Sequence, residues 1–205
     1  MTIRGTVFIA RIYGSPARQT PPSLTGFPYP ARKMAAATTR NQKETPMSLK
    51  LRRVVTGHDA AGRATVKIDE LVQNAAATRP GVEASVIWTT HGFPVDNDDP
   101  ADGAARPVGT SEHDGTVFRV VCLQPGAAPR IHRTDSIDYA VVMAGEIHME
   151  LDDGNQVHLK QGDVLVQRGT IHNWFNRGTV PCTIAFVLVG AKPARPGGKE
   201  LPAQG

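Results

Sequence analysis

Two glycine-punctuated segments hold the residue types best suited to chemistry. One, residues 126–145, contains His132, Thr134 and Asp138, and a later one contains His172. His132 and Thr134 are two positions apart, so in a strand their side chains share one face. An imidazole with a pKa near neutrality serves as a general base, and a carboxylate can hold it in place. These residues predict proton transfer on a small molecule, such as dehydration, isomerisation or decarboxylation.

Other side chains of the same segments suit substrate binding. Arg130 and Arg168 predict contacts with a carboxylate or phenolate, because the guanidinium fork matches planar anions. Tyr139 and Trp174 predict walls for a flat substrate. Each has an ordinary alternative, which is a core position for an aromatic ring and a surface ion pair for an arginine.

Strands with a two-residue period must position these side chains. The runs that alternate in this way, or are continuously apolar, are 117–123, 146–151, 156–160, 163–167 and 183–189. Turn residues separate them every 8–12 positions, a spacing typical of an all-β sandwich or barrel. Weaker strands are expected at 49–55, 64–68 and 84–90, and one or two helical turns within 69–80.

The turn Asp152-Asp153-Gly154 predicts the register of one hairpin. A three-residue loop with Gly154 in the left-handed conformation pairs Ile147 with Leu159. All apolar side chains then lie on one face, and His148 lies opposite His158 on the other. Facing histidines can bind a metal, but a solvated pair is the more ordinary interpretation.

The positive charge of the chain is confined to its start. The 205 residues have a formal charge of +4, yet residues 1–46 alone carry seven basic side chains against one acid. The remainder is slightly acidic, which excludes a nucleic-acid-binding body. No stretch approaches the roughly 18 apolar residues of a membrane span, and two cysteines are too few for a disulfide framework. We therefore expect no nucleic-acid partner and no membrane partner.

The two ends do not resemble folded domains. Residues 1–46 contain six prolines and Met34. They indicate a disordered leader or a mis-annotated one, with Met47 as the natural start instead of Met1. A cytoplasmic location follows, unless these acid-poor residues are an organelle transit peptide. Residues 191–205 are rich in proline, glycine and charge, and predict a loose tail.

The two segments resemble the paired motifs of the cupin superfamily. The residues at matching spacings are Gly126, His132, Asp138, Gly145, Gly162, His172 and Asn176. Three positions depart from the motifs: Thr134 replaces the second histidine, Asp138 the glutamate and Arg168 the proline. A narrower similarity, to RmlC-like small cupin-domain oxidoreductases of bacteria and of fungal polyketide gene clusters, extends over nearly all of residues 50–190.

The resemblance implies a single cupin β-barrel, a double-stranded β-helix of two antiparallel sheets, preceded by a strand arm. It divides the chain into a leader (1–46), an N-terminal arm (47–116), a barrel core (117–190) and a tail (191–205). Cupins of this kind commonly form dimers, so a homodimer is implied as well.

The resemblance also implies a ligand set. His132, Asp138 and His172 would point into one cavity from neighbouring strands. Two imidazoles and one carboxylate form a facial triad, which suits iron(II); manganese and zinc are alternatives. Thr134 removes the usual fourth ligand and Asp138 is one methylene shorter than glutamate, so a metal-free site remains open.

The function implied is that of a small-molecule enzyme. The relatives suggest an oxidoreductase-like activity on an aromatic or polyketide-derived carbonyl compound, with His132, Asp138 and His172 catalytic. Arg130, Thr134, Tyr139, Arg168 and Trp174 are the substrate-binding candidates. The alternatives are a metal-free acid–base lyase or isomerase, and a non-enzymatic ligand-binding cupin.

Overall fold

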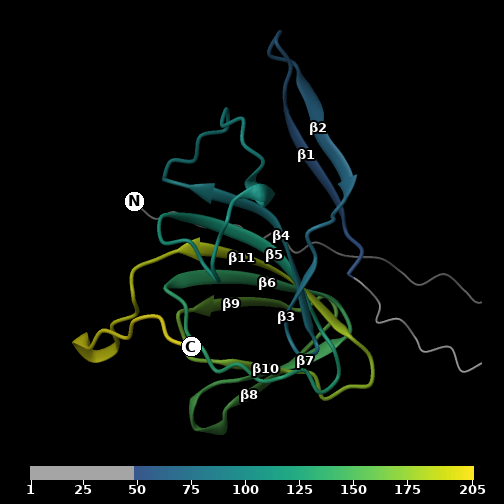
Figure 1. The fold of residues 1–205 in the computed structure, drawn as a ribbon. Coiled ribbons are helices and arrows are strands. Elements are labelled where there is room, and N and C mark those ends of the chain that lie inside the picture. The colour runs from purple at the N-terminus through teal and green to yellow at the C-terminus, as the bar shows by residue number, and fades with distance from the viewer. Residues whose placement is uncertain (1–48) are drawn as a thin grey trace, which may run out of the picture. The chain divides into compact units, whose positions relative to one another are not determined.

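The computed structural model describes residues 49–205, so the predicted leader lies outside the described residues. Short strands make up nearly all of its regular secondary structure (Figure 1). The strands are β1 (Arg52–His58), β2 (Ala64–Leu71), β3 (Ala76–Arg79), β4 (Val82–His91), β5 (Gly115–Leu123), β6 (Ser136–Ala144), β7 (Glu146–Glu150), β8 (Gln156–Lys160), β9 (Val164–Arg168), β10 (Asn173–Phe175) and β11 (Cys182–Gly190). Three single-turn 3₁₀ helices complete the elements: η1 (Gly103–Ala105), η2 (Asp152–Gly154) and η3 (Pro196–Gly198).

Two antiparallel sheets enclose one core. The larger has the order β3-β4-β5-β11-β6-β9, and the smaller has the order β10-β7-β8. Buried apolar side chains from both sheets pack together, including Val142 and Ile184 from the larger and Ile147, Met149 and Trp174 from the smaller. Apolar burial of this kind is the main stabilising term of a fold. The prediction of an all-β fold with two antiparallel sheets is confirmed.

The segment before β5 has two parts. Strands β1 and β2 form a separate two-stranded ribbon, whereas β3 and β4 extend the six-stranded sheet through β5. Arg53 of β1 anchors the ribbon: its guanidinium donates to both carboxylate oxygens of Asp102, each at 2.7 Å. Asp102 also caps η1, so one carboxylate joins the ribbon to the loop that follows β4.

The β7–β8 hairpin confirms the predicted register. Ile147 pairs with Leu159 and His148 with His158, and the two imidazole rings stack at 4.3 Å between centroids. Gly154 has φ +71°, the left-handed conformation that the turn requires. Turn chemistry and the two-residue period agree here, so local sequence alone determined the pairing.

Two expectations differ from the structure. Residues 69–80 form no helix: β2 continues to Leu71, and β3 follows, pairing with β4. Strand partners supplied by β1 and β4 override the weak helical pattern. The tail is also not loose, because Gln204 and Arg133 form a two-bond backbone bridge that folds residues 191–205 back onto the segment before β6. Among the described residues, no helix is long and apolar enough to cross a membrane.

Candidate functional site

Two histidines from distant parts of the sequence form the centre of the site. Residues 132 and 172 make an isolated antiparallel bridge, in which each backbone N–H donates to the other's carbonyl at 3.0 Å. Their rings lie 4.2 Å apart between centroids. The bridge joins the segment before β6 to the segment before β10, so it brings one histidine of each motif side by side.

Backbone contacts determine the tautomer of both rings. Nδ1 of His132 lies 3.1 Å from the carbonyl oxygen of Arg130, and Nδ1 of His172 lies 3.0 Å from that of Thr170. A carbonyl oxygen only accepts, so each Nδ1 must be the protonated, donating nitrogen. In the neutral ring Nε2 then holds the lone pair, which is the form of a general base or a metal ligand.

Both imidazoles are neutral at pH 7. Burial, the neighbouring His132 and the charge of Arg130 lower the pKa of His172 to about 4. Burial is also the main cause that lowers the pKa of His132, with smaller effects from Arg130 and Arg79. A neutral imidazole has the lone pair of Nε2 free to accept a proton from a substrate. A lowered pKa makes it a weaker base.

Asp138 belongs to a separate polar chain. The Ser136 hydroxyl is 2.8 Å from Oγ1 of Thr134 and 2.5 Å from Oδ1 of Asp138. The Gln167 amide donates to Oδ2 of Asp138 at 3.1 Å. Burial raises the pKa of Asp138, although Ser136 and the charge of Arg119 oppose this. Thr134 is buried, and a hydrogen bond to Ser136 connects its hydroxyl to Asp138.

The predicted metal set is not assembled. Within residues 49–205 no group of three or more His, Cys, Asp or Glu side chains is placed to hold a metal ion. Both oxygens of Asp138 accept hydrogen bonds from Ser136 and Gln167, and no hydrogen bond or ion pair joins this carboxylate to either histidine in that part of the chain. Asp138 lies on β6, whereas the strand after His172 pairs with β7. The side chains present do not fit a facial triad.

Aromatic rings border the histidine pair. Trp174 is buried and meets His172 edge-on at 5.9 Å and Phe186 edge-on at 5.7 Å. Trp174 was predicted as an aromatic wall, and the structure places it beside the imidazoles. Phe186 was not predicted, since the alternation of β11 alone does not say which of its faces is turned inward.

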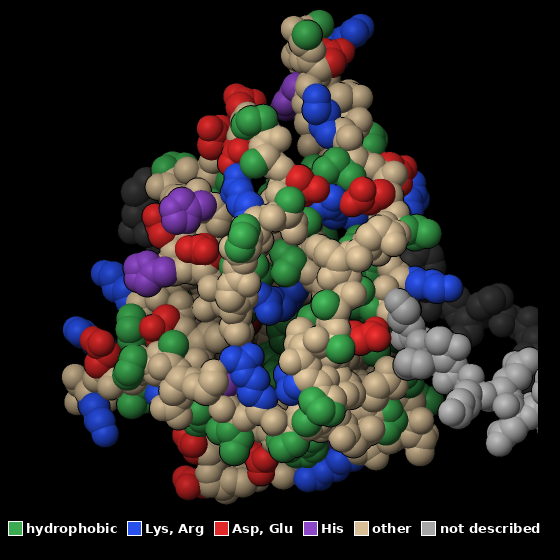
Figure 2. Space-filling view, in the orientation of Figure 1, with side chains coloured by type: hydrophobic (Ala, Val, Ile, Leu, Met, Phe, Trp, Pro, Cys, Tyr) green, Lys and Arg blue, Asp and Glu red, His purple; other side chains and the backbone are tan. Residues whose placement is uncertain are grey.

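The charges of Arg130 and Arg79 act on the same centre. Arg130, a predicted substrate-binding residue, lies two residues before His132, and its charge lowers the pKa of both histidines. Arg79 and Arg119 were missed. The available signal was parity: Arg119 interrupts an apolar strand on the face that also includes Val117 and Leu123, both buried. Lys and Arg side chains lie around a hollow near the centre of the face shown in Figure 2.

Two predicted binding residues lie elsewhere. Tyr139 is half exposed, and Arg168 is exposed near the tail residues Arg195 and Leu201. Side chains alternate along a strand, and Tyr139 and Arg168 directly follow the inward-facing Asp138 and Gln167. Both therefore belong to the outer face, and their prediction as substrate contacts does not agree with the structure.

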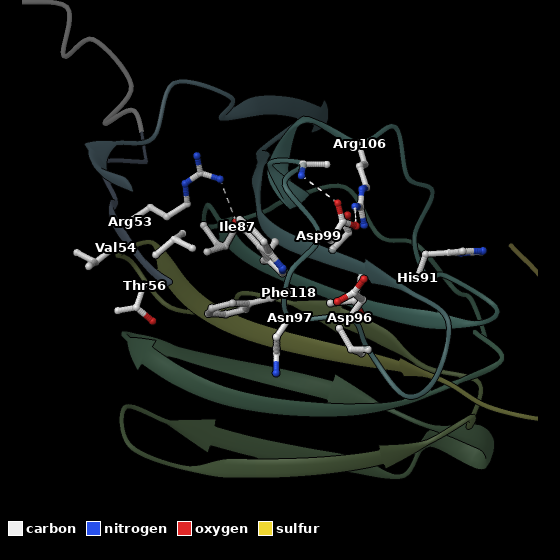
Figure 3. A pocket seen from close by; sticks show the side chains of 16 residues that line it. Arg53, Val54, Thr56, Ile87, His91, Asp96, Asn97, Asp99, Arg106 and Phe118 are labelled. Atoms are coloured by element: carbon white, nitrogen blue, oxygen red, sulfur yellow. Dashed lines mark hydrogen bonds and ion pairs between the residues drawn. The ribbon is translucent and has the colours of Figure 1, made fainter. Parts of the chain in front are cut away.

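A cavity of about 400 Å³, separate from the histidine pair, lies between the ribbon and the loop after β4 (Figure 3). Its lining includes Arg53, Phe118 and Arg106 but no residue of the two motifs. Its arginines are paired, Arg53 with Asp102 and Arg106 with Asp99. Because each of these arginines forms an ion pair, their positive charges are balanced by carboxylates. Arg130 and Arg79, the arginines that act on His132, form no ion pair within residues 49–205.

Comparisons with known proteins agree on the family. The cupin domain model matches residues 119–189. Phomopsin biosynthesis cluster protein C' of Diaporthe leptostromiformis is 38% identical over 169 residues, which cover 78% of this chain and 88% of the relative. The cupin-domain-containing oxidoreductase fogC of Aspergillus ruber is 32% identical over 156 residues, covering 73% of this chain and 77% of the relative.

Among solved structures, two similar ones show sequence identities of 15% or less. The polyketide cyclase RemF of Streptomyces resistomycificus has a TM-score of 0.42 at 15% identity, over 65% of this chain and 78% of that protein. An RmlC-like cupin of Shewanella frigidimarina has a TM-score of 0.40 at 14% identity, over 58% of this chain and 85% of that protein. The matched domain and the extent of the curated relatives together establish that this chain belongs to the cupin family.

Proposed function

We propose that this cupin is a small-molecule enzyme whose reacting centre is the pair His132 and His172. The observation that supports this most directly is that both rings are neutral and have Nδ1 held by a backbone carbonyl. Such a ring offers Nε2 as a base of fixed orientation. The step assigned to the chain's own residues is removal of a proton from the carbon next to a carbonyl group. The proton passes to Nε2, and the electron pair of the C–H bond moves into the enolate.

The proposed substrate is an aromatic or polyketide-derived carbonyl compound, and the proposed class of activity is that of an oxidoreductase. Relatives named cupin-domain-containing oxidoreductases support the class. One is fogC, described above, and another is virC of Hypocrea virens, which is 31% identical to this chain over 148 residues. Trp174 and Phe186 support a flat substrate, because they place aromatic surface beside the bases.

The second candidate is an isomerase or lyase that needs proton transfer alone. It is favoured by the engagement of Asp138 with Ser136 and Gln167, which leaves the histidines without a carboxylate to complete a ligand set. In this case Asp138 is a positioning residue for the polar chain. The two candidates differ in whether the product has the same oxidation state as the substrate.

The test follows exchange of protons for deuterium next to the carbonyl of acetophenone and 4-acetylbenzoate, by proton NMR in D₂O. We expect the wild-type protein to accelerate exchange, and His172→Gln to lose about 100-fold or more of that acceleration. His91→Gln, whose side chain is exposed, is the matched control and should behave as wild type. Exchange that is equal in wild type and His172→Gln, or no acceleration at all, contradicts the proposal and leaves ligand binding as the function.

Two further measurements separate the candidates. Product analysis by mass spectrometry distinguishes a change of oxidation state from an isomerisation or cleavage. Metal content of protein purified without chelator, repeated for His172→Ala, tests the ligand set. Stoichiometric iron, manganese or zinc that disappears in the variant would overturn our interpretation that these side chains do not form a metal site.

We also propose a homodimer, formed through the outer face of β6 and β9. Tyr139 and Val166 are cross-strand partners there, as are Val141 and Val164, and all four side chains are substantially exposed. Met143 extends the same apolar patch along β6. Contiguous exposed apolar surface of this kind is typical of protein–protein contacts, and a second copy of the chain is the partner that the resemblance to dimeric cupins suggests.

A further inference from the structure

Arg130 is coupled electrostatically to two other arginines and to the histidine pair. Arg79 ends β3, Arg119 lies in the middle of β5, and Arg130 precedes His132 by two residues. The charge of Arg130 lowers the pKa of Arg79, of Arg119 and of both histidines. Arg130 therefore lies within electrostatic reach of the other four groups.

The hydrogen-bond partners of Arg79 and Arg119 are uncharged. Nε of Arg79 donates to the carbonyl of Ala128 at 2.8 Å, and Arg119 donates to the carbonyl of Gly109 at 2.6 Å. Nε of Arg119 is buried and has no partner within residues 49–205. In the same part of the chain, neither arginine makes an ion pair, in contrast to Arg53 and Arg106. Burying an arginine without an anion is costly, because guanidinium remains charged at any ordinary pH.

Within residues 49–205, no acid forms an ion pair with Arg119. Asp138 is the acid whose charge acts on Arg119, and burial raises the pKa of that carboxyl. Arg130 donates to the hydroxyl of Thr110 and to the backbone oxygen of Gly205, so part of its guanidinium is already hydrogen-bonded. Arg119 is left as the guanidinium with free donor capacity at the site.

Arg119 lies beside apolar surface. Its cross-strand partners are Phe186 on β11 and Val86 on β4. With Val86, Ala84 and Val108 it lines a cavity of about 330 Å³, a size that suits small ligands. Phe186 connects this side of the site to Trp174 and thence to His172. A single unpaired guanidinium in an apolar setting fits an organic acid better than a polyvalent, strongly hydrated anion.

We infer that the substrate carries a carboxylate, which Arg119 binds in the positive field of Arg79 and Arg130, while its apolar body contacts Phe186. The inference rests on the proposed function, since it names the substrate class of the same site. A planar carboxylate accepts two parallel N–H bonds from one guanidinium, and Nε is one of the donors in that arrangement. The buried and unpartnered Nε of Arg119 would then gain its missing partner.

The test compares two probes that differ only in charge, 4-acetylbenzoate and the neutral 4-acetylbenzamide, by isothermal titration calorimetry. We expect wild type to bind the acid more tightly than the amide. Arg119→Met should weaken binding of the acid by about 10- to 100-fold and change binding of the amide by less than about threefold. Arg195→Met removes an arginine whose partner is the nearby Glu200 on the surface, and it should change neither.

Several results would overturn the inference. They are equal affinity of wild type for both probes, no binding of either at millimolar concentration, and an equal loss for both probes in Arg119→Met. Inorganic phosphate that binds as tightly as 4-acetylbenzoate would also overturn it, since the site would then take small inorganic anions. Where Arg119→Met does not fold, Arg119→Lys and Arg79→Met replace it, and each should reduce the preference for the acid over the amide.

Proton exchange in the same samples separates this inference from the proposed function. Tight, Arg119-dependent binding of 4-acetylbenzoate without any exchange would support the carboxylate site and contradict the catalytic role of the histidines. Exchange in 4-acetylbenzamide at the rate of the acid would support the histidines and contradict the carboxylate site. His172→Gln should abolish exchange and keep the preference for the acid.

Discussion

The burial of His172 predicts that the protein loses stability between neutral pH and pH 5. Its pKa is about 4 in the folded state against an ordinary value of 6.5. Between these two values the unfolded chain binds a proton that the folded chain excludes. Stability therefore rises with pH, is complete above the unfolded pKa, and falls progressively as the pH decreases towards 4.

The size of the effect follows from the two pKa values. Lowering the pH from 7 to 5 should cost about 2 kcal/mol of unfolding free energy through His172 alone. His132 shifts in the same direction, and the pair titrates as a unit. Asp138 acts in the opposite direction, because its raised pKa makes the folded state gain protons as the pH falls.

Urea unfolding at pH 7, 6 and 5 with a chelator present, followed by tryptophan fluorescence, measures this dependence. His172→Gln removes the titrating ring, so its stability should fall by about 2 kcal/mol less than that of wild type over the same interval. His91→Gln is the matched control, since the His91 side chain is 71% exposed, and should keep the wild-type dependence. If His172→Gln and wild type lose equal stability, the imidazole is not desolvated as the structure indicates, and the neutral-base argument fails with it.

Three further outcomes test other parts of the structure. Arg119→Met should leave the free energy of unfolding unchanged or raise it by about 1–2 kcal/mol, because it removes a half-buried charge that makes no ion pair within residues 49–205; a clear loss in urea titrations would contradict this. Gly145→Ala should be destabilised by about 2 kcal/mol more than Gly154→Ala in thermal unfolding. Both glycines have positive φ, but only at Gly145 would Cβ approach a neighbour, the carbonyl oxygen of Pro181 at 2.5 Å. Val164→Asp should convert a dimer to a monomer in light scattering, whereas Val180→Asp, also exposed but outside the patch, should not; a monomeric wild type would refute the proposed interface.

Local patterns predicted the parts of the fold that depend on local geometry. The β7–β8 register follows from Gly154 and the two-residue period, and both are visible in the sequence. Residues 69–80 were assigned wrongly because their strand partners, β1 and β4, are chosen by the fold as a whole and not by the segment itself. The tail was likewise unpredictable, since its bridge from Gln204 to Arg133 spans more than seventy residues.

The alternation of side chains along a strand explains which predicted site residues face inward and which face outward. His132 and His172 lie together as their motif positions imply, and the inward turn of Asp138 places Tyr139 outward by alternation alone. The same rule, applied to the apolar strand around Arg119, turns a charged side chain inward with Val117 and Leu123. It could not show that Ser136 and Gln167 would occupy both oxygens of Asp138, because those contacts depend on side-chain rotamers and on the pairing of β6 with β9.

The half-buried Arg119, which makes no ion pair within residues 49–205, fits the proposed binding role better than a structural one. A core selected for stability alone would place an apolar side chain at this position, where Phe186 and Val86 are the strand neighbours. A guanidinium that lowers stability is retained where a ligand supplies the missing charge, as binding sites are commonly less stable than the cores around them. Arg119→Met separates these explanations: unchanged or higher stability with weakened binding of 4-acetylbenzoate supports a binding role, whereas lower stability with unchanged binding supports a structural one.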